Sequence, residues 1–228
     1  MDAQAAAATE QGQRTRDSIV DAAMNLMYTH GVAGTSLDKV LTACGAGKSQ
    51  MYHYFKDKSQ LVDAVVMRNI KRILAGQPML TELHTWDDFD RWAEQLLDLH
   101  RTPDGPFPCP LGNLAGELGD DERVAGLLNQ AYRKWESHLA RGLAILRDKG
   151  ELSADADPAR LAQATMACLQ GGLLLAHVRR DITPLEDALH IAIAHLKQQA
   201  PHGEQAGITD VRVPGEGPRT LPPLLDRG

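Results

Sequence analysis

The sequence predicts an all-α protein, and three observations support this prediction. Apolar residues recur at i, i+3 and i+4 along most of the chain, which is the spacing of one face of a helix. Glycine and proline fall between these segments, where helices end. No segment alternates apolar and polar residues as a half-buried strand does. With 228 residues, 43% of them hydrophobic and 24% charged, the chain can form one small and one larger globular domain.

The first part of the chain predicts a small domain at residues 14–74. Residues 1–13 are rich in Ala and Gln without periodicity, and we expect them to form a disordered tail. An apolar stripe then predicts a helix that Gly31 ends, and a fourth helix starts at Ser59. Between them we expect a second helix capped by Thr35 or Ser36 and ended by Gly45, and a third at about 47–55.

The second part predicts a larger helical domain at residues 75–200. Gly76 and Pro78 mark the boundary, and Thr85 can cap the next helix. The prolines at 102–110 force a loop. The further helices are expected at about 110–118, 121–149, 158–179 and 184–199, with Asp157 and Thr183 as caps of the last two and residues 201–228 as a disordered tail.

The charge distribution suggests a local site for phosphate. The whole chain carries −6, but residues 14–72 hold nine Lys or Arg against five Asp, a net charge of +4. A basic head on an acidic body suits DNA binding through the head alone, although chance asymmetry is an alternative.

We expect a cytoplasmic protein with no membrane span. No window approaches eighteen uninterrupted apolar residues, and the N-terminus lacks the features of a secretory signal. The three cysteines Cys44, Cys109 and Cys168 are odd in number and widely spaced, which suits a reducing compartment.

The second and third helices, joined by a glycine turn, match a helix-turn-helix, whose third helix enters the DNA major groove. Side chains at its start would face the bases, and those at other helix starts or beside its apolar stripe would contact phosphate. The groove-facing candidates are Lys48, Ser49 and Gln50, and the phosphate candidates are Thr35, Ser36, Tyr52, His53 and Lys58. An ordinary surface helix is the alternative.

Enzyme motifs are weak, so we predict no catalytic activity, no cofactor and no metal site. Gly47-Lys48-Ser49 looks like the end of a P-loop, but position 42 is Thr where that motif needs glycine, and a helix precedes it instead of a strand. The sequence contains neither HExxH nor GxSxG.

The run from Gly45 to Leu61, GAGKSQMYHYFKDKSQL, resembles the signature of the TetR family of one-component transcriptional regulators. The resemblance is close over about residues 15–74. It implies a homodimer with an N-terminal DNA-binding domain and a C-terminal domain for ligand binding and dimerisation. Its partners would be double-stranded operator DNA and a small-molecule effector, and the expected function is a ligand-released repressor. Gly47 departs from the Ser or Thr common at that helix start.

The resemblance also gives the second domain two roles. The last two helices (about 158–199) are expected to form the dimer interface, because each carries one face at helical spacing. The first face is rich in small residues (Leu161, Thr165, Cys168, Gly171, Gly172 and Leu175), and the second consists of Leu189, Ile193 and Leu196. Packing of these faces in the core of a single chain is the alternative. The ligand-pocket candidates are Trp92, Gln95, Leu96, Cys109, Asn113, Glu117, Trp135 and His138, although an aromatic stripe also suits plain core.

Cys109 suggests a second function, a thiol-based sensor of electrophiles or oxidants. The run CPLGNLAGEL at 109–118 resembles a stretch found in some TetR-family regulatory domains. With Pro110 at the first helical position, Cys109 would be the N-cap, where the helix dipole favours thiolate. A structural cysteine in a proline loop is the alternative.

Overall fold

The computed structural model describes residues 2–201, with no side-chain description for residues 2–9, and shows the predicted all-α architecture. No strand occurs in this range. The helices are α1 Asp2–His30, α2 Leu37–Cys44, α3 Lys48–Tyr54, α4 Lys58–Ala75, a 3-10 helix at Pro78–Thr81, α5 Trp86–His100, α6 Pro110–Leu118, α7 Glu122–Asp148, α8 Pro158–Arg179 and α9 Thr183–Lys197.

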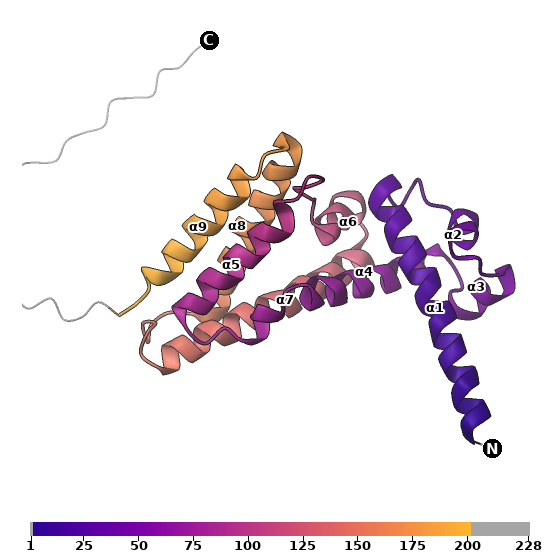
Figure 1. Cartoon of the computed structure of the whole chain (residues 1–228), viewed down its shortest axis with the longest axis horizontal. Helices are drawn as coiled ribbons and strands as arrows, with labels where there is room; N and C mark the ends of the chain where they lie inside the picture. Colours follow the sequence, from indigo (N-terminus) through magenta and orange to yellow (C-terminus); the bar gives the residue numbers. More distant parts are fainter. Residues whose placement is uncertain (1, 202–228) are drawn as a thin grey trace, which may run out of the picture.

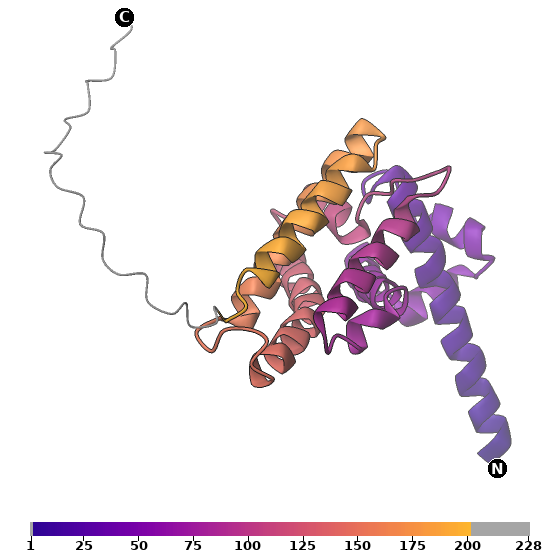
Figure 2. The same cartoon turned by 60° about the vertical axis from the view of Figure 1, so that its left-hand side comes forward.

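The small helices α2 and α3 lie beside α1 at one end of the molecule, and α8 and α9 pack together at the other (Figure 1). Helix α4 connects the two ends, because it packs against α1 and also against α7. The turned view in Figure 2 shows α5 and α9 side by side on the outer layer of the larger domain. Helix α4 is therefore part of the packing of both ends of the molecule.

Helix α1 is longer than predicted. It begins at Asp2, so the prediction of a disordered tail at 1–13 is wrong for residues 2–13. The reason is the composition: Ala5–Ala8 and the neighbouring glutamines lack an apolar stripe but have high intrinsic helix propensity. Of the tail predicted at 201–228, only Pro201 lies within the described residues.

Most predicted caps are present. Ser36 and Asp157 accept hydrogen bonds from backbone N–H groups at the starts of α2 and α8, and Thr85 with Asp88 forms a capping box on α5. The predicted cap at Thr183 is wrong. Asp181 accepts the Thr183 backbone N–H at 3.0 Å and the Thr183 hydroxyl at 2.8 Å, so Thr183 is the capped residue and the first residue of α9.

Helix α8 alone among the described helices is long and apolar enough by composition to cross a bilayer. Its most apolar window has a mean hydropathy of 1.3, yet 44% of that window is buried inside the fold. Leu169 and Ala176 of this helix are fully buried. These features are also those of a helix in the core of a globular domain.

Candidate nucleic-acid interface and ligand cavity

The helix-turn-helix is built from a short turn and a small apolar contact. Gly45 adopts a left-handed conformation (φ +69°) and donates its N–H to the Leu41 carbonyl at 2.9 Å, which ends α2 and starts the turn. Met51 and Phe55 are buried and fix α3 against α1 and α2. The opposite face of α3 is consequently turned to solvent.

That solvent face carries most of the predicted DNA-binding residues. Lys48, Ser49, Gln50 and His53 are exposed, and Tyr52 is 59% exposed. Lys48 forms an ion pair with Asp38 at 3.2 Å, but both side chains are more than 70% exposed, so the pair is weak and can open.

Gln50 also has a structural task. Its Oε1 accepts the Gly47 N–H at 2.9 Å and so caps the start of α3, which compensates for the missing Ser or Thr at position 47. Its side-chain amide nitrogen has no partner in the described part of the chain.

Three predicted phosphate contacts have other partners in the structure. Thr35 is only 1% exposed, and its hydroxyl donates to the Gly31 carbonyl at 2.8 Å, so a direct phosphate contact by this side chain is wrong. Lys58 is half-buried, and its ammonium donates to the Val32 carbonyl. Ser36 is exposed, but its Oγ accepts the Lys39 N–H at 3.2 Å. All three side chains thus organise the backbone around the turn between α1 and α2.

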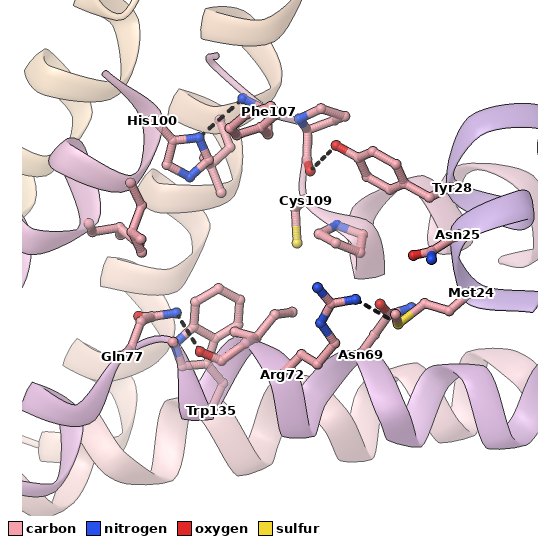
Figure 3. A pocket seen from close by; sticks show the side chains of 17 residues that line it. Met24, Asn25, Tyr28, Asn69, Arg72, Gln77, His100, Phe107, Cys109 and Trp135 are labelled. Carbon is pink, nitrogen blue, oxygen red and sulfur yellow. Dashed lines mark hydrogen bonds between the residues drawn. The ribbon is translucent and has the colours of Figure 1, made fainter. Parts of the chain in front are cut away.

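A cavity of about 490 Å³ lies where the small domain meets the large one. One wall comes from α1 and α4, and the others come from α5, the 101–109 loop, α7 and α8 (Figure 3). The volume falls in the range of about 300–1,000 Å³ that is usual for small-molecule sites. The walls are mainly apolar, with a few polar side chains from α1, α4 and α5.

Three of the eight predicted pocket residues line this cavity: Leu96, Cys109 and Trp135. The other five do not. Trp92 is buried and donates its Nε1–H to Gln77 at 3.0 Å, and Gln95 lies outside the lining with a buried Oε1 that has no partner within the described chain. Asn113 and Glu117 border a separate space of only about 20 Å³, and His138 faces Arg141 at 3.4 Å.

The sequence analysis missed the cavity residues on the DNA-binding side: Met24, Asn25, Tyr28, Asn69 and Arg72. One signal was available. Asn69 follows Val65 and Val66 on the apolar face of α4 and is 6% exposed, and a polar residue at such a position needs a polar neighbour.

Electrostatics in the cavity argue against a reactive thiol. Cys109 is the N-cap of α6, as predicted. Burial raises the pKa of Cys109, opposed by hydrogen bonds from the N–H groups of Gly112 and Leu111. The amides at the start of α6 do act to lower this pKa, but the predicted net lowering is wrong, because desolvation of the thiolate outweighs them. Burial also lowers the pKa of His100, which favours its neutral form.

Helix α6 connects the cavity wall to the DNA-binding domain. Its first residue, Pro110, lines the cavity, and Glu117 near its other end accepts the backbone N–H groups of Val32 at 2.7 Å and Ala33 at 2.6 Å. These two amides belong to the turn between α1 and α2. Gly31 in the same turn has φ +73°, and a Cβ there would lie 3.1 Å from the Glu117 carboxylate.

The faces of α8 and α9 that were predicted to form a dimer interface are mostly intrachain core. Leu161, Thr165 and Gly172 of α8 are buried, as are Leu189, Ile193 and Leu196 of α9. A Cβ at Gly172 would lie 2.8 Å from the Ala188 Cβ, so this glycine permits the close approach of α9 to α8.

The other face of this helix pair remains apolar and exposed. Leu174, Val178 and Ile191 are each more than 60% exposed, Leu175 is 44% exposed, and a Cβ at Gly171 would meet nothing within 4 Å. We call these five residues the outer apolar face. Cys168, also in the predicted set, is half-buried beside it.

Together these features define a class of protein: a helix-turn-helix DNA-binding domain joined by shared helices to a helical domain with a cavity. Comparison with known proteins agrees. The family described as "Bacterial regulatory proteins, tetR family" matches residues 19–65, and "Tetracyclin repressor-like, C-terminal domain" matches residues 89–192.

Known relatives and a solved structure extend the match over most of the chain. An uncharacterised HTH-type transcriptional regulator of Lactococcus lactis is 30% identical over 187 residues, covering 76% of this chain and 89% of its own. The HTH-type transcriptional repressor ComR of Escherichia coli is 28% identical, covering 78% and 85%. The crystal structure of reduced E. coli NemR superposes with a TM-score of 0.72 at 24% identity, over 82% of this chain and 100% of that one. The chain belongs to the TetR family of transcriptional regulators.

Proposed function

We propose that this regulator is a dimeric, ligand-responsive repressor. In this proposal α3 of each protomer lies in the major groove of a palindromic operator, and a small molecule in the cavity releases the DNA. The protein acts in the cytoplasm, where the DNA is. The relatives are transcriptional regulators rather than enzymes, and one of them is named a repressor, which supports this sign of regulation.

The observation that carries the proposal is the composition of the cavity wall. Met24 and Tyr28 come from α1, which also packs against α2 and α3. Asn69 and Arg72 come from α4, whose N-terminal residue Lys58 holds the Val32 carbonyl. A ligand in the cavity therefore contacts the same two helices that set the position of α3.

Coupling needs a ligand that prefers one arrangement of these helices over another. A ligand against Cys109 and Pro110 displaces the start of α6, and Glu117 transmits that displacement to the turn at Val32. A coupling free energy of about 1–3 kcal/mol changes the operator affinity about 5- to 150-fold. In a dimer, small rotations of both heads also change the spacing between the two α3 helices, which must match about one turn of DNA.

Dimerisation through the outer apolar face is the second part of the proposal. Leu174 and Val178 of α8 and Ile191 of α9 are large apolar side chains left more than 60% exposed on two helices that pack together, and apolar groups gathered in this way mark interaction surfaces. A two-fold arrangement sets this face against itself, so that the four helices of two protomers form one bundle. This proposal keeps the two predicted helices and, of the predicted residues, Gly171 and Leu175, but adds Leu174, Val178 and Ile191 in place of the buried ones.

A thiol-sensing function through Cys109 is less well supported. The buried thiol has a raised pKa, so little thiolate forms at neutral pH. Its position in the cavity wall suits packing against a bound ligand.

A DNA-binding assay tests the proposed function directly. Purified protein is titrated against a labelled fragment containing the region upstream of its own coding sequence, at several salt concentrations, and against an unrelated fragment of the same length. We expect salt-dependent, sequence-specific binding with two protomers bound per site. Equal affinity for both fragments contradicts the proposal.

A further inference from the structure

The charged side chain that lines the cavity is positive, and no negative one lies beside it in the described chain. Arg72 rises from α4 into the space, and no Asp or Glu of the described chain lines it (Figure 3). Of the thirteen arginines between residues 10 and 201, five form ion pairs with carboxylates, namely Arg14, Arg68, Arg91, Arg101 and Arg123. Arg72 forms none in this range, and the one contact of its guanidinium is to the Met24 sulfur at 3.8 Å.

The polar groups around Arg72 are also able to donate hydrogen bonds. Asn69 lies one turn earlier on α4, is 6% exposed, and its side-chain amide has no hydrogen-bond partner in the described chain. This amide borders the cavity, so it can donate a hydrogen bond to an acceptor group of a ligand. Both residues are labelled at the same side of the cavity in Figure 3.

His100 supplies a donor from the opposite side. Its Nδ1 accepts the Phe107 backbone N–H at 3.2 Å, so in the neutral ring the proton is on Nε2. Figure 3 shows that this second ring nitrogen is turned toward the cavity, across from Arg72. The neutral ring adds a donor without adding a second full positive charge.

The remaining walls are apolar and include aromatic rings. Leu96, Leu99, Leu173, Phe107 and Trp135 surround the polar group of residues. A ligand that fits must therefore combine one anionic end with an apolar body of several carbon atoms. A single guanidinium compensates one negative charge, which favours a carboxylate over a dianionic phosphate ester.

From this arrangement we propose that the effector is a small organic carboxylate with an apolar or aromatic body, whose carboxylate pairs with Arg72 and accepts a hydrogen bond from Asn69. The inference rests on the proposed function, because it names the chemical class of the ligand for the same cavity. It is new in assigning Arg72, a residue of the helix shared by both domains, as the group that recognises the effector. Pairing with Arg72 pulls on the C-terminal half of α4.

The test compares carboxylates with their neutral amides on the full-length protein. The probes are 3-phenylpropanoate, 4-phenylbutanoate and 2-naphthoate, each paired with its primary amide, and binding is measured by thermal shift and titration calorimetry. We expect at least one carboxylate to bind about ten- to hundredfold more tightly than its amide, because a charge-assisted hydrogen bond is lost in the amide.

Two variants separate the site from general charge effects. Arg72→Gln should weaken carboxylate binding by the same factor and leave amide binding unchanged. Lys71→Gln removes the same charge from an adjacent exposed residue and should have less than about a twofold effect. Equal melting temperatures of the unliganded variants establish that both are folded.

The outcomes distinguish this inference from the proposed function. If no carboxylate binds more tightly than its amide, or if Arg72→Gln binds the carboxylates as the original protein does, the anionic class is wrong. Operator binding without ligand is measured for the unsubstituted protein on the same samples. Loss of DNA binding by the unsubstituted protein overturns the repressor proposal instead, whatever the calorimetry gives.

Discussion

The carboxylate of Glu117 on α6 accepts the backbone N–H of Val32 at 2.7 Å, although the two residues lie 85 positions apart in the chain. The other carboxylate oxygen accepts the Ala33 N–H at 2.6 Å. The adjacent Val32 carbonyl accepts the Lys58 ammonium, so the turn is held from both sides. This turn connects α1, which lines the cavity, to the helix-turn-helix.

Replacing Glu117 should therefore affect both stability and regulation. Glu117→Ala leaves two turn amides without their charged acceptor, and we expect the free energy of unfolding to fall by about 1–3 kcal/mol. We also expect a bound ligand to change operator affinity less than it does in the original protein. Urea unfolding and DNA titration with and without ligand measure the two effects. Glu82→Ala, which removes an exposed carboxylate without a hydrogen bond to the described chain, is the control; matching behaviour of both variants would argue against the connection.

The elements of this fold were predictable where the signal is local. Ser36, Thr85 and Asp157 cap helices as predicted, because a capping side chain bonds amides two or three residues away. Thr183 does not act as a cap because Asp181, two residues earlier, accepts both its N–H and its hydroxyl, which makes Thr183 the first residue of the helix. The helical conformation of residues 2–13 was not predicted, because helix propensity without an apolar stripe is a weak signal.

The cavity was harder to predict because it is assembled from distant segments. Met24 of α1, Arg72 of α4 and His100 of α5 meet only after the two domains pack together, and no spacing in the sequence reports that meeting. The aromatic stripe predicted Trp92 and Trp135 equally, but only Trp135 reaches the cavity, since Trp92 points into core and bonds Gln77. The predicted dimer face shows the same limit: Gly171 and Gly172 are neighbours in the sequence, but Gly172 faces Ala188 of α9 within the chain whereas Gly171 meets nothing within 4 Å.

Lys48 provides a test of the DNA-facing surface. Its side chain is largely exposed at the start of α3, and the one ion pair it forms within the described residues, with Asp38, opens easily. Lys48→Gln should weaken operator binding and reduce the slope of log affinity against log salt by about 0.9, corresponding to one lost phosphate contact. Fluorescence anisotropy at four salt concentrations measures the slope. Lys134→Gln removes the same charge at an exposed position of α7 and should leave the slope unaltered. A similar loss of affinity in both variants would show that the effect comes from the net charge of the protein.

The outer apolar face predicts the oligomeric state. Val178 and Ile191 are 69% and 65% exposed in the single chain, and a glutamate in their place would be buried without a partner in the proposed dimer. Val178→Glu and Ile191→Glu should each produce folded monomers at micromolar concentration that bind the operator at least about tenfold more weakly. Sedimentation velocity and helical circular dichroism measure assembly and folding. Met67→Glu, at an exposed position on α4, should remain dimeric, and a dimeric Val178→Glu would place the interface elsewhere.

Asp88 predicts a specific pH dependence of stability. The pKa of Asp88 is lowered from 3.8 to about 2, chiefly by the Thr85 hydroxyl and further by the His84 N–H and Arg91, against an opposing effect of burial. Because the folded state holds the lower pKa, this group stabilises the protein above about pH 4, and the contribution is lost as the pH falls toward 2. Asp88→Asn should therefore lower stability at pH 5 and 6, with a difference that shrinks below pH 4. Urea midpoints between pH 6 and 3 test this, with Asp87→Asn as the exposed neighbour that should show no such convergence.

Thiol labelling decides between the repressor and the thiol-sensing alternative. Cys109 is buried with a raised pKa, whereas Cys44 and Cys168 are half-buried. Since only thiolate reacts with iodoacetamide, Cys109 should be the slowest of the three to be alkylated at pH 7, and its rate should rise as the pH increases. Mass spectrometry of tryptic peptides over time gives the three rates. A ligand in the cavity should slow Cys109 further and leave Cys44 unchanged, because only Cys109 is in the wall. Rapid, selective alkylation of Cys109 at neutral pH would instead support a sensing thiol.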